Sequence, residues 1–463
     1  MTQSLAALTD LWRLADGAPA ALDRVRFTGV EPALPSSFRV GTAAQAAVGA
    51  GALAASEIWR LRGGDALGVS VDMRHAAAEF RSERYLRVDG GEAPELWDKI
   101  AGVYRCGDGA WVRIHTNFPH HRDGILALLD CEHGRESVQA RLTSWQGADF
   151  EAAAAERGLV VAMMRSFDDW DADPQGRAVA ALPVVAIERL GDVPPQPLPA
   201  ADRPLGRIRV LDLTRIIAGP VAGRVLAAHG ADVMRISAPH LPFIAPLVID
   251  SGRGKLSAHL DLREPPDRSR FAELLRSADV FVQSYRPGAI ARRGFGPQDA
   301  AELRPGIVYA SLSAYGHDGP WSGRRGFDSL VQTASGFNHA EGEAAGVEGP
   351  KALPCQALDH ASGHLLAFGI MMALARRAAS GGSWHVRVAL AATGKWLRGL
   401  GRLEDGLSAP DSTVDDVADL LETSDSAFGR LTAIRHAGRL DGMEPCWQRP
   451  AVPLGTHEAR WPD

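Results

Sequence analysis

Short apolar segments alternate with amphipathic segments through the second half of the chain. Strands are expected over residues 208–213, 233–236, 280–283 and 307–312, and helices over 219–228 and 268–276. Short buried strands that alternate with helices form βαβ units. The pattern therefore predicts an α/β fold, with a doubly wound parallel sheet of Rossmann-like type.

A helix, a glycine pair and a strand occur twice in the same order. The first copy runs from a small-residue helix over 41–61 through Gly63-Gly64 to a strand over 69–73. The second runs from an apolar helix over 364–377 through Gly381-Gly382 to a strand over 386–390. Two weak copies of one unit are predicted, although both are rich in alanine and chance similarity is the alternative.

Between these copies lies a smaller α+β region. A hairpin is expected over 104–114, with helices near 122–129 and 149–157. Four prolines within 193–199 indicate an extended, semi-rigid linker. Near the C-terminus, an acidic helix is expected over 414–421 before an irregular tail.

The order of the predicted elements and the proline-rich linker divide the chain into five parts. The expected parts are an N-terminal helical region with the first copy (1–97), a small α+β domain (98–192), a linker (193–204), a Rossmann-like catalytic domain (205–403) and a C-terminal tail (404–463).

Asp359 stands just before the second apolar helix, which is expected to begin near Ala361. This is the N-cap position, where a carboxylate accepts backbone N–H bonds. Capping alone is one interpretation of Asp359, and a nucleophile is the other. The position that matches Asp359 in the first copy is Gly41.

Composition and charge narrow the possible functions. The 463 residues carry a net charge of −6, which gives no support to nucleic acid as a bulk partner. The four cysteines are scattered without a CxxC pair, which argues against a structural zinc site and suits a reducing compartment. No signal peptide is evident, and the most apolar run is too short to span a bilayer. We expect a cytoplasmic enzyme without a membrane or metal partner.

The loops after the strands favour an anionic ligand other than a dinucleotide. The first βα turn lacks GxGxxG and the second strand ends in Ser237, which both count against NAD or FAD. No GxSxG elbow occurs, which disfavours an α/β-hydrolase. Arginines and a lysine near the strand ends suit phosphates, because parallel sheets bind ligands there. His115, His120 and His121 form a cluster that could suggest a metal site. No carboxylate or cysteine lies at ligand spacing from them, so they are expected to be surface histidines.

Five ordered segments resemble the N-terminal half of the family III (CaiB/BaiF) CoA-transferases. They are Val210–Thr214 with Ala218-Gly219-Pro220; Leu226–Gly230 with Ala231-Asp232-Val233; Gly254-Lys255 with Leu260-Asp261-Leu262; Ala278-Asp279-Val280 with Tyr285–Gly288; and Ser313–Gly316 with Gly319-Pro320. The order ends in Gly326-Phe327-Asp328 and Asp359–Gly363. The parts of the chain before residue 193 look like segments that ordinarily follow this half, so the order looks permuted.

The resemblance implies specific residues and partners. It implies that Asp359 is the nucleophile and that coenzyme A is a co-substrate, with no permanently bound cofactor. It further implies that Ile216, Lys255, Tyr285, Arg286 and Arg292 line the CoA site, and that the chain forms an interlocked homodimer. Ser237-Ala238 stands where relatives carry a Glu and an Arg, which leaves the adenine end open.

The expected reaction transfers CoA from an acyl-CoA to a carboxylic acid through an aspartyl anhydride and an aspartyl-CoA thioester. Oxyanion donors are expected from Ala361-Ser362-Gly363 or from Gly90-Gly91, and the helix dipole is expected to help keep Asp359 ionised. Asp328 is expected to be a structural acceptor.

Two alternatives stay open. One is an acyl-CoA racemase of the same family, whose catalytic histidine precedes the aspartate that matches Asp328. Phe327 stands there and cannot accept a proton, so His360 or His339 would have to substitute. The other is a CoA-binding relative that has lost catalysis, for which Ser237-Ala238 and Ile217 are the signs.

Overall fold

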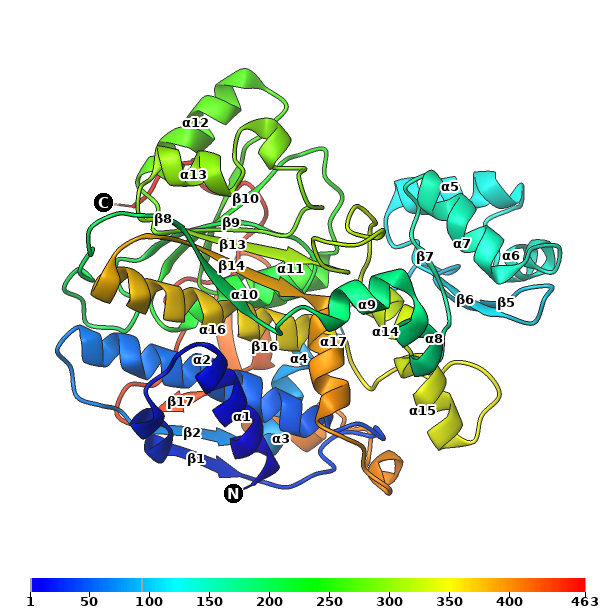
Figure 1. Ribbon diagram of the computed structural model, residues 1–463, viewed down its shortest axis with the longest axis horizontal. Helices are drawn as coiled ribbons and strands as arrows, with labels where there is room; N and C mark the ends of the chain where they lie inside the picture. Colours follow the sequence, from blue (N-terminus) through cyan, green and yellow to red (C-terminus); the bar gives the residue numbers. More distant parts are fainter. Residues whose placement is uncertain (1, 93–94, 463) are drawn as a thin grey trace.

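The computed structural model describes residues 2–92 and 95–462. A seven-stranded sheet lies at its centre, in the order β11-β10-β9-β12-β13-β14-β8 (Figure 1). All neighbours are parallel except β8, which pairs antiparallel with β14. The strands are β8 (Ala186–Gly191), β9 (Arg209–Leu213), β10 (Asp232–Ser237), β11 (Lys255–His259), β12 (Val280–Gln283), β13 (Val308–Ser313) and β14 (Ser383–Ala389).

The strand order confirms the predicted fold class. Numbered along the chain from β9, the parallel strands lie in the order 3-2-1-4-5-6, as in a doubly wound fold. The order reverses between β9 and β12, and such a reversal opens a crevice at the carboxyl ends of the strands. The ligand site is therefore expected beside these two strands.

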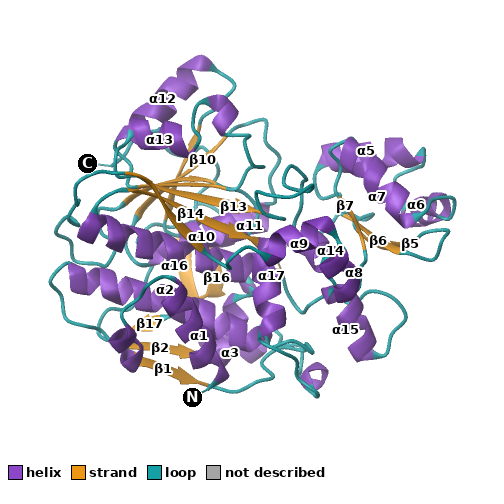
Figure 2. Cartoon of the chain, viewed as in Figure 1, coloured by secondary structure: helices purple, strands orange, loops and turns teal. Residues whose placement is uncertain are grey.

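Alternate side chains of the strands enter two cores on opposite faces. Val280 and Val282 pack into the core beneath the sheet with helices α10 (Ala218–Ala228) and α16 (Ala357–Ser380). Phe281 points to the other face, where α12 (Pro265–Arg276) and α13 (Pro297–Leu303) pack. Figure 2 shows helices on both sides of the sheet.

A second layer covers the outer side of α16. Helix α2 (Val40–Leu61) packs against α16, and β2 (Val69–Asp72) lies beyond it in a small sheet with β1 (Val25–Thr28) and β17 (Arg439–Leu440). Both helix–glycine–strand units thus form, and their helices lie face to face. Helix α1 (Gln3–Leu14) packs against the same layer.

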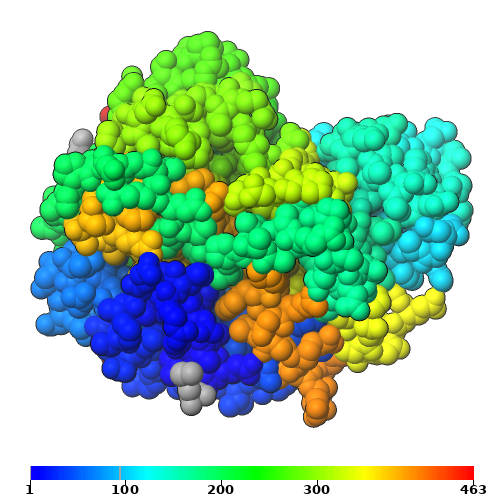
Figure 3. Space-filling view, in the orientation of Figure 1, coloured from blue at the N-terminus to red at the C-terminus, as the bar shows by residue number. Residues whose placement is uncertain are grey.

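The small α+β domain forms a lobe at one side of the molecule (Figure 3). Strands β5 (Gly102–Arg105), β6 (Trp111–Ile114) and β7 (Val161–Met163) carry α5 (Pro119–Leu129), α6 (Arg135–Leu142) and α7 (Gly147–Glu156) around a core of their own. The predicted hairpin and helices are present.

The linker and the second glycine pair lie in close contact. Residues 192–200 adopt no helix or strand, and Gly382 donates its N–H to the Val193 carbonyl at 2.8 Å. Gly381 has φ +70°, and a Cβ there would overlap the backbone of Val193 and Pro194. Only glycine therefore lets the linker cross the end of α16 at this distance.

The acidic helix predicted over 414–421 is present as a 3₁₀ helix, but the irregular tail predicted directly after it is wrong. A short 3₁₀ helix, η4 (Asp415–Leu420), leads directly into β15 (Leu421–Ser426), which forms a hairpin with β16 (Gly429–Ile434). The buried side chains of Leu431 and Ile434 anchor this hairpin to the molecule. Their burial explains why the segment after the 3₁₀ helix forms strands and not an irregular tail.

Helix α16 is long and apolar enough to cross a membrane by length and composition alone. The apolar stretch of this helix is entirely buried inside the molecule. Helix α16 is therefore the central core helix of this fold.

Candidate active site

Asp359 occupies the first turn of α16. The helix begins at Ala357, and the N-cap residue is Gln356, whose side chain makes no capping bond. The prediction that Asp359 is the N-cap is therefore wrong, because the helix begins at Ala357 and not near Ala361.

Asp328 caps the helix from outside. It begins α14 (Asp328–Ala334), and its Oδ2 accepts the backbone N–H of Asp359 at 2.8 Å. Leu358 donates a second backbone N–H to the same carboxylate, and Gln332 donates its side-chain amide. These bonds give Asp328 the structural role expected from the sequence and hold the Asp359 backbone in place.

The surroundings of Asp359 oppose its ionisation. Burial raises its pKa well above the ordinary value, and the negative charges of Asp328 and Glu83 raise it further. A helix dipole contributes about 0.3–1 kcal/mol, whereas full burial shifts a pKa by up to ~3–5 units. The expected help of the helix dipole toward ionisation is therefore opposed by two larger effects, desolvation and the two carboxylates.

His360 follows Asp359 but points away from the reaction side. Its Nε2 lies 3.0 Å from Glu83 Oε2 on α4 (Ser82–Tyr85), and its ring stacks on Phe80. The pair lies within the core. The N-terminal region thus supplies the carboxylate that holds the His360 ring beneath the first turn of α16.

Asp359 lines a cavity of about 390 Å³ at the carboxyl ends of the central strands. Its 6% exposed surface faces this space. Ile216 and Arg215 from the turn after β9, and Tyr285 and Arg286 from the turn after β12, form part of the wall. The cavity therefore lies at the reversal of strand order, where the fold places its ligands.

Four arginines make this cavity strongly cationic. Arg324 and Arg325 come from the segment before α14 and join Arg215 and Arg286 in the lining. Arg215 packs on the ring of Phe118 from the small domain at 5.0 Å. Guanidinium groups suit the phosphates of CoA and carboxylates, because they bind both through paired donors.

Ile216 has a strained backbone at the wall of the cavity. Its φ is +74°, which is an outlier for a β-branched residue. Such strain costs about 1–3 kcal/mol and persists where the surrounding structure imposes it, often at functional sites.

Two of the predicted CoA residues lie outside the cavity lining. Lys255 is buried, and its Nζ lies 2.7 Å from Asp212 Oδ2 and 2.7 Å from the Pro220 carbonyl. Its predicted contact with CoA is wrong, because the ammonium is bound inside the core. Arg292 is exposed on η2 (Ala291–Arg293), and its contact with CoA stays a prediction.

The histidines of the small domain also differ from expectation. His120 is exposed, but His115 and His121 are buried at 4% and 1% exposure. His115 stacks on Phe327 at 4.0 Å. His121 lines the cavity with both ring nitrogens unpartnered among the described residues. Burial, with His120 and Arg325, lowers the pKa of His121 to about 3, so its imidazole is neutral.

The expected oxyanion donors do not face the cavity. Ala361, Ser362 and Gly363 are buried inside α16, and the Ser362 hydroxyl lies 2.7 Å from Thr393 Oγ1. Gly90 and Gly91 form the exposed turn between β3 (Arg87–Val88) and β4 (Gly91–Glu92). Both suggestions are wrong, since neither set of N–H groups reaches the wall beside Asp359.

The two histidines considered as racemase bases do not line the cavity. His360 is held by Glu83, and His339 lies on α15 (Phe337–Ala345), 3.3 Å from Glu343. Phe327 lines the cavity but has no basic atom.

Comparison with known proteins matches residues 205–402 to the family model described as CoA-transferase family III. This segment belongs to CoA-transferase family III. It contains β9 to β14, Asp328 and Asp359, and so most of the cavity wall.

Relatives resemble the chain both within and beyond the family III segment. An acyl-CoA transferase of Gibberella moniliformis is 30% identical over 367 residues, or 70% of this chain and 64% of that protein. The probable fatty acyl-CoA transferase Rv3272 of Mycobacterium tuberculosis is 36% identical over 201 residues, or 41% of this chain and 50% of that protein. The chain thus spans less than two thirds of the length of these relatives.

A solved structure of a CAIB/BAIF family protein from Brucella suis is also similar. It is 27% identical, with a TM-score of 0.39, over 43% of this chain and 55% of that one.

Proposed function

We propose that the chain transfers CoA from an acyl-CoA to a carboxylic acid, with Asp359 as the covalent carrier. The observation that supports this most is the position of Asp359: one carboxylate at the wall of a 390 Å³ cavity that four arginines line. The arginines attract the anionic substrates, and the family III segment provides the precedent for CoA transfer.

The proposed reaction has four acyl-transfer steps. Ionised Asp359 attacks the thioester carbonyl of the donor, which forms a mixed anhydride and releases CoA thiolate. The thiolate attacks the aspartyl carbonyl, which forms an aspartyl-CoA thioester and releases the donor acid. The acceptor carboxylate attacks this thioester, which forms a new anhydride and releases CoA thiolate. The thiolate then attacks the acyl carbonyl of the anhydride and expels the Asp359 carboxylate. The products are the new acyl-CoA and free Asp359.

The raised pKa of Asp359 has a role in this sequence. A carboxylate that is poorly solvated is a stronger nucleophile than one in water, because fewer hydrogen bonds must be broken before attack. Cationic substrate-binding groups and the neutral His121 then face the charge that develops on the carbonyl oxygen.

A panel of acyl-CoA donors against carboxylic acids tests the proposal, with Asp359→Asn as the inactive variant. The new acyl-CoA should appear with wild-type protein, and the variant should lose at least ~10³-fold in kcat, which corresponds to ~4 kcal/mol of barrier. Normal turnover by Asp359→Asn contradicts the proposal.

We further propose that the chain works in the cytoplasm as a homodimer. The resemblance to interlocked relatives supports the dimer, and sedimentation at several protein concentrations measures it. A monomer at all concentrations contradicts this part alone.

A further inference from the structure

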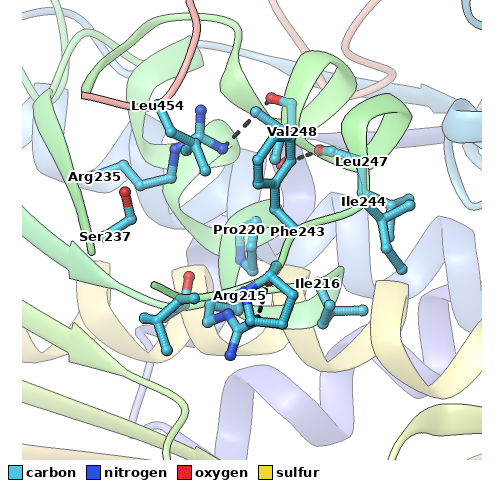
Figure 4. Close-up of a pocket in the computed structure, with 14 residues that line it drawn as sticks. Arg215, Ile216, Pro220, Arg235, Ser237, Phe243, Ile244, Leu247, Val248 and Leu454 are labelled. Atoms are coloured by element: carbon cyan, nitrogen blue, oxygen red, sulfur yellow. Dashed lines mark hydrogen bonds between the residues drawn. The ribbon is translucent and has the colours of Figure 1, made fainter. Parts of the chain in front are cut away.

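A second, smaller pocket adjoins the Asp359 cavity on the α10 side of the sheet (Figure 4). Arg215, Ile216, Leu241 and Pro242 line both spaces. Arg215 donates a hydrogen bond to the Pro242 carbonyl, so its guanidinium forms part of the partition between them.

The inner end of this pocket holds two polar side chains, Arg235 and Ser237, that have atoms without hydrogen-bond partners among the described residues. Arg235 and Ser237 lie two residues apart on β10 and therefore point to the same face of the sheet. Arg235 is 4% and Ser237 9% exposed. Arg235 Nε and Nη2 and Ser237 Oγ have no hydrogen-bond partner among the described residues. We name this space the Arg235 pocket.

The remaining walls are apolar. Figure 4 shows Phe243, Ile244, Leu247 and Val248 across the space from Ser237, with Leu454 of the C-terminal tail above. The one bond that Arg235 makes is long, from Nη1 to the Val248 carbonyl at 3.4 Å. Asp212, whose charge acts on Arg235, is already paired with Lys255.

A buried cation with free donors is costly unless an anion binds it. Burial lowers the pKa of Arg235, although an arginine keeps its proton in proteins. Two guanidinium N–H donors beside one hydroxyl form a set that a carboxylate accepts in a bidentate manner.

The size of the pocket selects among anions. Its volume is about 40 Å³, and because one water-sized sphere needs about 10–15 Å³, it holds roughly three such spheres. A carboxylate has three heavy atoms and a phosphoryl group has five. The smaller, planar carboxylate is therefore favoured over a phosphoryl group.

We propose that the Arg235 pocket binds a carboxylate group. Two sources supply that chemistry. One is the far carboxylate of a dicarboxylic acid or acyl group whose near end reaches Asp359, and this source rests on the proposed function. The other is a small free monocarboxylic acid that enters beside Phe243, which is 58% exposed.

Binding to the full-length chain tests the pocket without any turnover. Titrations use sodium acetate, sodium succinate and sodium phosphate, each followed by calorimetry, on wild type, Arg235→Met, Arg235→Lys and Ser237→Ala. At least one carboxylate should bind wild type and bind Arg235→Met at least tenfold more weakly, with a smaller loss in Arg235→Lys. Ser237→Ala removes one hydroxyl and should weaken carboxylate binding about threefold. Equal binding in all four proteins, or preferential binding of phosphate, overturns the proposal.

Turnover distinguishes the two sources. The ratio of kcat/KM for succinate to that for butyrate, which has the same chain length, should fall at least tenfold in Arg235→Met if the dicarboxylate is the source. An unchanged ratio together with Arg235-dependent acetate binding assigns the free acid. If no acid accepts CoA while acetate binding still depends on Arg235, the proposed function fails and the pocket stands.

Discussion

Burial raises the pKa of Asp359, and its nearest carboxylates raise it further. Asp328 holds the helix start through the backbone N–H of Asp359, and the negative charge of Asp328 also raises the pKa of the Asp359 side chain. Asp328 therefore positions the backbone of Asp359 and also weakens the acidity of its side chain.

Asp328→Asn should separate these two effects. Asparagine keeps an oxygen for the backbone N–H but loses the charge, so the pKa of Asp359 should fall. Since attack needs the ionised form, the acid limb of the kcat/KM profile should move to lower pH. The pH dependence of CoA transfer measures this, and a limb that stays in place or moves to higher pH contradicts the account.

His121 is expected to act as a neutral hydrogen-bond donor to the substrate. His121→Phe keeps an aromatic ring and removes the donor, so kcat/KM should fall about tenfold, as for one hydrogen bond of ~1–2 kcal/mol. His120→Phe is the matched control, because His120 is the exposed neighbour. Equal effects of the two substitutions argue against a direct role for His121.

At the scale of elements, α16 depends on close contact with α10. A Cβ at Gly363 would lie 2.6 Å from the Ala218 carbonyl oxygen and 2.8 Å from Val221 Cβ. In α2, a Cβ at Gly51 would meet its nearest atom, Met371 Cε, at 3.9 Å. The two buried helix glycines therefore differ in the space they have.

Gly363→Ala should destabilise the protein by about 1–3 kcal/mol, because α16 must move away from backbone atoms. Gly51→Ala should be neutral or should stabilise it by up to ~1 kcal/mol, because alanine favours helix and its methyl has room. Urea denaturation of both variants measures the difference. A Gly363→Ala protein as stable as Gly51→Ala contradicts the packing described.

The elements differ in how far the sequence determines them. The strands of the central sheet follow from their short apolar runs, since both faces of the sheet are covered. The start of α16 does not, because the capping group is Asp328, 31 positions away. The sequence does not show that Lys255 is buried, because its partner Asp212 lies 43 positions earlier. The burial of His121 does not follow from the sequence either, because it depends on how the small domain docks.

At the scale of the whole molecule, a buried polar cluster joins the N-terminal region, the family III segment and the tail. Glu79 at the end of α3 (Met73–Glu79) accepts from His436 Nδ1 at 2.9 Å and from Ala437 N at 2.8 Å. Arg224 of α10 and His364 of α16 lie within 4 Å of the same carboxylate. This shared centre predicts that these regions unfold together.

Glu79→Gln should therefore destabilise the protein by about 3–5 kcal/mol. Burial opposes ionisation of Glu79, but His436 and its other partners hold its pKa well below the ordinary value. Its stabilisation is thus present above the unfolded pKa of about 4.3 and is lost as the pH falls through the folded pKa, so the difference should shrink in acid.

Glu444→Gln is the matched control. Glu444 pairs with Arg439 at the surface, and such pairs contribute about 0–1 kcal/mol. Denaturation at pH 7 and pH 4 measures both variants. Similar losses in the two variants contradict a central role for the cluster.

The covalent role of Asp359 is tested most directly by trapping its intermediate. Wild-type protein is incubated with an acyl-CoA and hydroxylamine, digested, and analysed by mass spectrometry for the peptide that contains Asp359. The account predicts a hydroxamate on Asp359 that forms only when acyl-CoA is present, together with loss of activity. Full turnover with an unmodified Asp359, or a hydroxamate on another side chain, contradicts it.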